Sequence, residues 1–196
     1  TSASARRMVR FIIDLAADVS LRDRRSADLL KEIGCKSAVD VTADPAFLLE
    51  PDEDEAGSVL EAAGLSRGTS PLIGVSIRPF PSFTPGKQRL LAQGLSTLAK
   101  RIHGRLILLP FCYEGSNSDL AMSKAFADLL APDVSRTVLE QEISPRGMLG
   151  LIGRMQLVLA TRFHAAVFAM RQSLPFLAVA ANPQPAIGTK WTPDPS

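Results

Sequence analysis

The chain has few of the side chains that bind metals, form disulfides or stack on nucleic-acid bases. Its two cysteines, Cys35 and Cys112, lie far apart, with no C-x-x-C pair and no metal-ligand spacing, so we predict that both are reduced and buried. One Trp, one Tyr and a net charge of only +2 argue against a nucleic-acid partner. Neither a Gly-rich phosphate loop nor a metal motif occurs. We therefore expect no metal site, no cofactor and no nucleic acid.

Long apolar runs are also missing. Arg171 interrupts the longest candidate, which falls short of the roughly 18 residues that a membrane span needs, and the first residues do not form a signal peptide. We therefore expect a soluble, cytoplasmic chain with at most peripheral contact with the inner face of the membrane. Arginines near the start could add attraction to anionic lipid, although a solvated helix face is the simpler explanation for most of them; they stand at positions 6, 7, 10, 22, 24 and 25.

What is present is enough for a sizeable core, because 46% of the 196 residues are apolar. From residue 71 onward, short apolar runs alternate with segments of helical period. The runs predict strands at 72–77, 106–111, 137–139, 157–161 and 176–180. The segments between them predict helices at 85–102, 119–130, 145–152 and 163–172. This alternation is typical of an α/β fold with a doubly wound parallel sheet, in which every strand ends at the same rim.

The first 70 residues are less regular. The pattern predicts an uncapped helix over 1–17, a short strand at 19–21, a helix over 24–33 that Asp23 caps and Gly34 ends, and a strand ending at Asp44. The acidic run 51–57 shows no core face and is interpreted as a linker or a solvated helix start. A domain boundary is therefore expected between about residues 50 and 70.

The most informative stretch is 156–181, where two apolar runs surround a polar break. Arg162 follows the first run and His164 stands in the first turn of the next helix. Ligands bind at the carboxyl edge of open parallel sheets, and a helix N-terminus carries partial positive charge, so this arrangement predicts a phosphate or carboxylate site. The same dipole favours a neutral His164. Position alone leaves open that Arg162 is a solvated strand-end charge and His164 an ordinary helix-start residue.

Other polar residues are expected near this break. Arg78 ends the strand at 72–77, so it belongs to the same rim as Arg162 and His164. For Asp23 and Ser26, the simpler interpretation from the residues is a helix cap and a first-turn polar residue. The predicted convergence of two arginines and a histidine depends on the topology.

Five segments, in order, resemble the polysaccharide pyruvyl transferase family. They are VSLRDRRSADLLKEIG with an R-D-x-x-S pattern, VTADPAFLL, GVSIRPF, LLPFCYEGSNSDLAMSKAFADLL with a central Asp, and LGLIGRMQLVLATRFHAAVFAMRQSLPFLAVA with an R-x-H core. Together they cover about residues 19–181. Two features depart from the family pattern: the chain starts late in the family's N-terminal half, and Ala181-Asn182-Pro183-Gln184 stands where Tyr-Asp-Pro-Lys is usual.

The resemblance implies two Rossmann-like halves that face a cleft, as in GT-B glycosyltransferases. Residues 1–66 would be a remnant of the N-terminal half with its linker, and residues 67–196 the C-terminal Rossmann-like domain. The implied reaction transfers a pyruvyl group from phosphoenolpyruvate to a pair of sugar hydroxyls of a polysaccharide or lipid-linked glycan, forming a ketal. Such a step belongs to cell-wall or exopolysaccharide biosynthesis.

The resemblance also implies roles for single residues. Arg78 and Arg162 would bind the phosphate and carboxylate of the donor, which guanidinium groups match. His164 would be the general acid and Asp23 the base for the sugar hydroxyl. Further substrate contacts are expected from Arg22, Ser26, Asp119 and Lys190.

Two other functions remain open at this stage. One is a GT-B type glycosyltransferase that uses a nucleotide sugar, although no ribose-binding carboxylate lies between Arg162 and Ala181. The other is a truncated, non-catalytic domain that binds anions or a partner.

Overall fold

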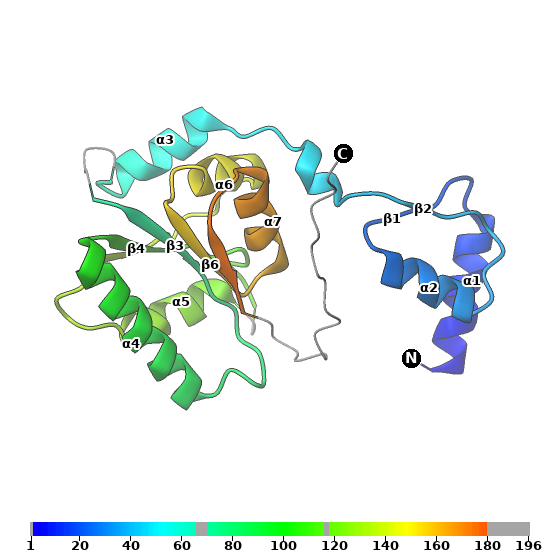
Figure 1. The fold of residues 1–196 in the computed structure, drawn as a ribbon, viewed down its shortest axis with the longest axis horizontal. Helices are drawn as coiled ribbons and strands as arrows, with labels where there is room; N and C mark the ends of the chain where they lie inside the picture. The colour runs from blue at the N-terminus through cyan, green and yellow to red at the C-terminus, as the bar shows by residue number, and fades with distance from the viewer. Residues whose placement is uncertain (1, 66–69, 116–117, 180–196) are drawn as a thin grey trace, which may run out of the picture. The chain divides into compact units, whose positions relative to one another are not determined.

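A computed structural model describes residues 2–65, 70–115 and 118–179 (Figure 1). The chain divides into two compact units, Thr1–Leu49 and Glu50–Ser196. Within the described residues, no helix is both long and apolar enough to cross a membrane.

The larger unit is built on a five-stranded parallel sheet. Its strands are β3 (Leu72–Ser76), β4 (Arg105–Leu108), β5 (Arg136–Val138), β6 (Leu157–Ala160) and β7 (Phe176–Ala178). Their order is β5-β4-β3-β6-β7, and all neighbouring pairs are parallel. The predicted α/β fold with five parallel strands is confirmed. The chain winds outward from β3 through β4 and β5 and then returns to the other side of β3, so the switch point lies between β3 and β6.

Helices cover both faces of this sheet (Figure 1). Helices α4 (Pro85–Ile102) and α5 (Asp119–Ala127) lie on one face. Ile73 and Val75 of β3 point into the core between the sheet and these two helices. The same core contains Phe126 and Leu159. Helices α3 (Glu53–Ala62), α6 (Pro145–Ile152) and α7 (Phe163–Arg171) lie on the other face. A core on both faces leaves the sheet rim as the place where polar side chains can gather.

Helix α3 begins in the acidic run, as one of the two predictions for this run had it, but the helix has a core face, which was not expected. Its acidic first turn suits a helix N-terminus, and Ala56, Val59 and Leu60 are buried. Helix α3 thus belongs to the larger unit, Glu50–Ser196. Val59 and Leu60 lie beyond the acidic run, so the run by itself shows almost none of this face.

The smaller unit contains α1 (Ala3–Leu15), β1 (Ser20–Leu21), α2 (Arg24–Glu32), β2 (Asp40–Val41) and the short 3₁₀ helix η1 (Pro45–Leu48). Strands β1 and β2 form a parallel pair. The expected absence of a cap on α1 is wrong, because the Ser2 hydroxyl accepts a hydrogen bond from the Ala5 N–H. Asp23 caps α2 as predicted, and Gly34, at φ +82°, lies just beyond its end.

Candidate functional site at the carboxyl ends of β3 and β6

The predicted convergence of Arg78, Arg162 and His164 is present in the structure. All three line one pocket of about 440 Å³, together with Ala160, Thr161, Phe163, Ala166, Ala178 and Val179. Arg78 follows β3 and Arg162 follows β6, and these two strands are neighbours. The pocket therefore lies at the switch point of the sheet, where doubly wound folds bind ligands.

Thr161 joins the two strand ends. Its N–H donates to the Ser76 carbonyl at 2.9 Å, and its Oγ1 accepts from the Arg78 N–H at 2.9 Å. Thr161 belongs to the polar break found in the sequence, but the pattern showed no role for it. These two bonds hold the backbone of Arg78 next to that of Arg162.

The Arg78 side chain has an unused donor. Its guanidinium carbon lies 6.0 Å from the centre of the Phe80 ring, and its Nε is buried without a hydrogen-bond partner among the described residues. A buried donor without a partner costs free energy. An acceptor oxygen of a bound anion would satisfy it.

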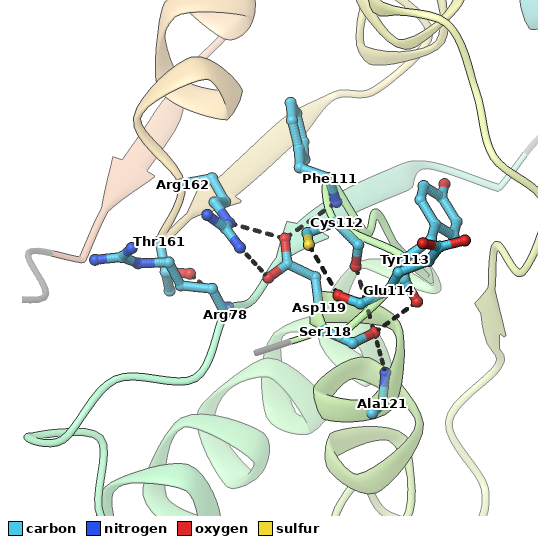
Figure 2. Close-up of polar contacts among 10 residues, drawn as sticks. All are labelled: Arg78, Phe111, Cys112, Tyr113, Glu114, Ser118, Asp119, Ala121, Thr161 and Arg162. Carbon is cyan, nitrogen blue, oxygen red and sulfur yellow. Dashed lines mark hydrogen bonds and ion pairs between the residues drawn. The ribbon is translucent and has the colours of Figure 1, made fainter. Parts of the chain in front are cut away.

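Arg162 is held by a buried carboxylate, as Figure 2 shows. Its Nε lies 2.8 Å from Asp119 Oδ2 and its Nη2 lies 2.6 Å from Asp119 Oδ1. The Asp119 side chain is fully buried, while 27% of the Arg162 side chain is exposed. Chiefly through these hydrogen bonds, Asp119 raises the pKa of Arg162 above its ordinary value. Arg162 therefore remains a cation and is not the freely solvated strand-end charge of the alternative interpretation.

The loop after β4 places Asp119 at the start of α5. Ser118 caps this helix by accepting from the Ala121 N–H, and its hydroxyl lies 3.0 Å from the Tyr113 carbonyl. The Phe111 N–H donates to Asp119 Oδ2 at 3.1 Å. These bonds fix the carboxylate from both sides of the loop (Figure 2).

Tyr113 and Cys112 lie in the same loop after β4. Burial, with smaller contributions from Glu142 and Asp119, raises the pKa of Tyr113 to about 12, so its phenol is neutral at pH 7.

Cys112 is a free thiol, as is Cys35, but both are only half-buried. The predicted full burial is wrong because each cysteine lies in a connecting segment rather than in a strand or helix.

His164 lies in the first turn of α7, as the sequence predicted. Arg162 occupies the N-cap position of this helix with an extended backbone and without a side-chain cap bond. The imidazole is exposed and lies edge-on to Phe163, with ring centres 5.4 Å apart, and 6.3 Å from the ring of Phe168. These aromatic rings flank an imidazole that also lines the pocket.

Three other predicted site residues lie in the smaller unit. The carboxylate of Asp23 accepts from the Ser26 N–H at 2.7 Å and from the Ser26 hydroxyl at 2.9 Å. These hydrogen bonds hold the pKa of Asp23 below its ordinary value. Arg22 Nη1 lies 3.3 Å from Asp44 Oδ2. Their roles toward a substrate stay predictions, and Lys190 lies outside the described residues.

Among the described residues, no cluster of three or more His, Cys, Asp and Glu side chains offers a metal site. The charged groups of the pocket are two guanidinium groups, which suit an anionic ligand with two or more acceptor oxygens.

Comparison with known proteins gives one family match. The model of the family described as polysaccharide pyruvyl transferase matches residues 1–183. A search among curated proteins gave no match.

Proposed function

The chain belongs to the polysaccharide pyruvyl transferase family, and on this premise we propose that the pocket between β3 and β6 binds phosphoenolpyruvate as the pyruvyl donor. The family supports pyruvyl transfer to a polysaccharide in general. The observation that carries the finer proposal is that Arg78, Arg162 and His164 line the same pocket. A donor with a phosphate and a carboxylate matches two guanidinium groups beside one proton-carrying side chain.

The two arginines take different parts in donor binding. Arg78 offers a buried Nε without a hydrogen-bond partner among the described residues, and Arg162 offers a guanidinium held by Asp119. The donor's phosphate and carboxylate each present several acceptor oxygens, so one arginine can serve each group. Together, the two arginines bind both anionic groups of the donor.

The reaction that we propose is an addition followed by a substitution. A proton reaches the methylene carbon of phosphoenolpyruvate while a sugar hydroxyl adds to the neighbouring carbon and loses its own proton. A second hydroxyl of the same glycan then displaces phosphate from that carbon. The products are a pyruvyl ketal and inorganic phosphate, which takes up the second hydroxyl proton.

Proton transfer falls to His164 and Asp23 in this proposal. His164 lines the pocket and is the general acid for the methylene carbon. Asp23, whose carboxylate accepts hydrogen bonds from the Ser26 N–H and hydroxyl, is the proposed base for the sugar hydroxyl. Arg22 and Ser26 stay proposed substrate contacts, as does Lys190. The acceptor is a polysaccharide or lipid-linked glycan that the enzyme meets at the cytoplasmic face of the membrane.

Titration calorimetry with phosphoenolpyruvate tests the donor site. A hydrogen bond to a charged group contributes about 1.5–3 kcal/mol, so Arg162→Ala should weaken binding by about one to two orders of magnitude. Arg89→Ala, which removes an exposed arginine of α4, is the control and should bind like the wild type. If Arg162→Ala binds the donor with unchanged affinity, the pocket is not the donor site.

A further inference from the structure

The orientation of Arg162 is set by one residue. Its Nε and Nη2 both donate to Asp119, at 2.8 and 2.6 Å. A guanidinium is planar, so a carboxylate bound to Nε and Nη2 leaves Nη1 on the opposite side. Figure 2 shows this side turned away from Asp119. The edge formed by Nη1 and the second Nη2 proton therefore remains for another acceptor.

Asp119 itself has no surface to offer a ligand. Its side chain is fully buried, and its oxygens accept three hydrogen bonds, two from Arg162 and one from the Phe111 N–H. The carboxylate also stands in the first turn of α5, where a negative charge is favoured. Removing Arg162 would leave this charge buried with only the backbone donor.

We infer that Asp119 is a positioning residue: it holds Arg162 so that one guanidinium edge faces the donor, and it does not touch the substrate. This inference rests on the proposed function. It differs from the substrate contact that the family resemblance implied for Asp119. Arg162 binds the anion as an oriented bidentate group rather than as a mobile charge.

Orientation and net charge make opposite predictions for Asp119→Asn. The substitution removes a negative charge beside the pocket, which by electrostatics alone would strengthen the binding of an anion. It also replaces one acceptor oxygen with an amide that cannot accept from Arg162, so the guanidinium loses its fixed orientation. If Asp119 positions Arg162, the affinity must fall although the site becomes more positive.

The experiment is titration calorimetry of the full chain with phosphoenolpyruvate, and with inorganic phosphate as the simpler probe. Asp119→Asn should weaken donor binding about tenfold. Asp133→Asn removes an exposed carboxylate that pairs with Lys100 and is the matched control, expected to bind normally. Unchanged or stronger donor binding by folded Asp119→Asn would overturn the inference.

A double variant separates positioning from other effects. In the Arg162→Ala background, Asp119→Asn should not weaken donor binding further, because the group that it positions is gone. A further tenfold loss would show that Asp119 acts by another route and would overturn the inference. If Arg162→Ala alone binds normally, the proposed donor site fails instead, so the two failures are distinguishable.

The wild-type protein supplies a measurement that does not depend on a variant folding. Nitrogen-15 NMR follows the Arg162 Nε–H, which Asp119 should keep in a single, slowly exchanging state before and after donor addition. The Nη protons should shift on binding. Loss of Nε–H protection when phosphoenolpyruvate binds would mean that the donor breaks the pair, which contradicts positioning by Asp119.

Discussion

Arg78, Arg162 and His164, the three proposed functional residues of the pocket, are each held in place by different contacts. A buried carboxylate fixes the Arg162 side chain, whereas Arg78 is held through its backbone by Thr161. His164, at the start of a helix, contacts two aromatic rings. The arginines serve to hold an anion, whereas an imidazole can give and take a proton near pH 7. Substitution of an arginine should therefore mainly reduce donor affinity, whereas substitution of His164 should mainly reduce turnover.

His164→Gln should lower turnover with little change in donor affinity. Loss of a general acid typically removes a factor of about 10² to 10⁴ in rate, while both guanidinium groups remain. Turnover is measured as release of phosphate from phosphoenolpyruvate in the presence of acceptor glycan. Donor affinity is measured by calorimetry. His103→Asn is the control, because His103 ends α4 in the left-handed conformation, at φ 51°, which Asn tolerates. Normal turnover by His164→Gln would exclude it as the acid.

Asp23→Ala should lower the melting temperature at pH 7, because it removes the cap of α2. The pKa of Asp23 is lowered in the folded protein, so its charge stabilises the fold above its unfolded pKa, and this contribution is lost as the pH falls through the lowered pKa. The difference from the wild type should thus be full at pH 7 and become smaller as the pH falls below the unfolded pKa. Asp18→Asn, at an exposed position, is the control for the loss of one surface carboxylate and should melt like the wild type at pH 7. If the difference in melting temperature between Asp23→Ala and the wild type does not change with pH, the charge of Asp23 does not contribute to stability.

At the scale of elements, the contact between α3 and α6 depends on small residues. A Cβ added at Gly150 of α6 would lie 2.8 Å from the Asp52 carbonyl oxygen and 3.1 Å from the Ala56 Cβ. The Glu55 carboxylate of α3 also accepts hydrogen bonds from the N–H and hydroxyl of Ser144, the N-cap of α6. The acidic start of α3 thus anchors the helix that precedes β6.

Gly150→Ala should destabilise the larger unit by about 1–3 kcal/mol, because the methyl group meets backbone that cannot move aside easily. Gly94→Ala is the matched control, since Gly94 is also helical but has nothing within 4 Å of the added Cβ. In Gly94→Ala, the gain in helix propensity should stabilise the larger unit by up to about 1 kcal/mol. Urea denaturation measures both values. Equal stabilities for the two variants would mean that α3 and α6 can separate without cost.

At the scale of the whole molecule, one unit holds the proposed donor pocket. Every residue that lines it lies between Arg78 and Val179, inside the unit Glu50–Ser196. The proposed base, Asp23, lies in the other unit. Residues 1–66 as a remnant of a second Rossmann-like half remain a proposal.

A chain of residues 50–196 should therefore fold cooperatively and bind phosphoenolpyruvate with an affinity within about threefold of the full chain. It should not catalyse transfer, because it lacks Asp23. Circular dichroism during thermal unfolding and calorimetry measure folding and binding. A large loss of donor affinity in the folded piece would show that residues 1–49 contribute to the donor site.

The sequence by itself determined the features that depend on local spacing. The alternation of apolar runs with helical periods specified five parallel strands, and their common rim followed from right-handed crossovers. Arg162 and His164 are two residues apart, so a strand end followed by a helix start places both at the same edge. The R-x-H core and four other segments identified the family that the match over residues 1–183 shows.

Only the tertiary structure decided which distant residues meet. Arg78 lies beside Arg162 because β3 pairs with β6, and no local pattern specifies which strands become neighbours. The pairing of Asp119 with Arg162 joins residues 43 positions apart, and the core face of α3 exists only against α6. Such contacts depend on the burial of side chains from separate segments, and a single sequence pattern records the segments but not their pairing.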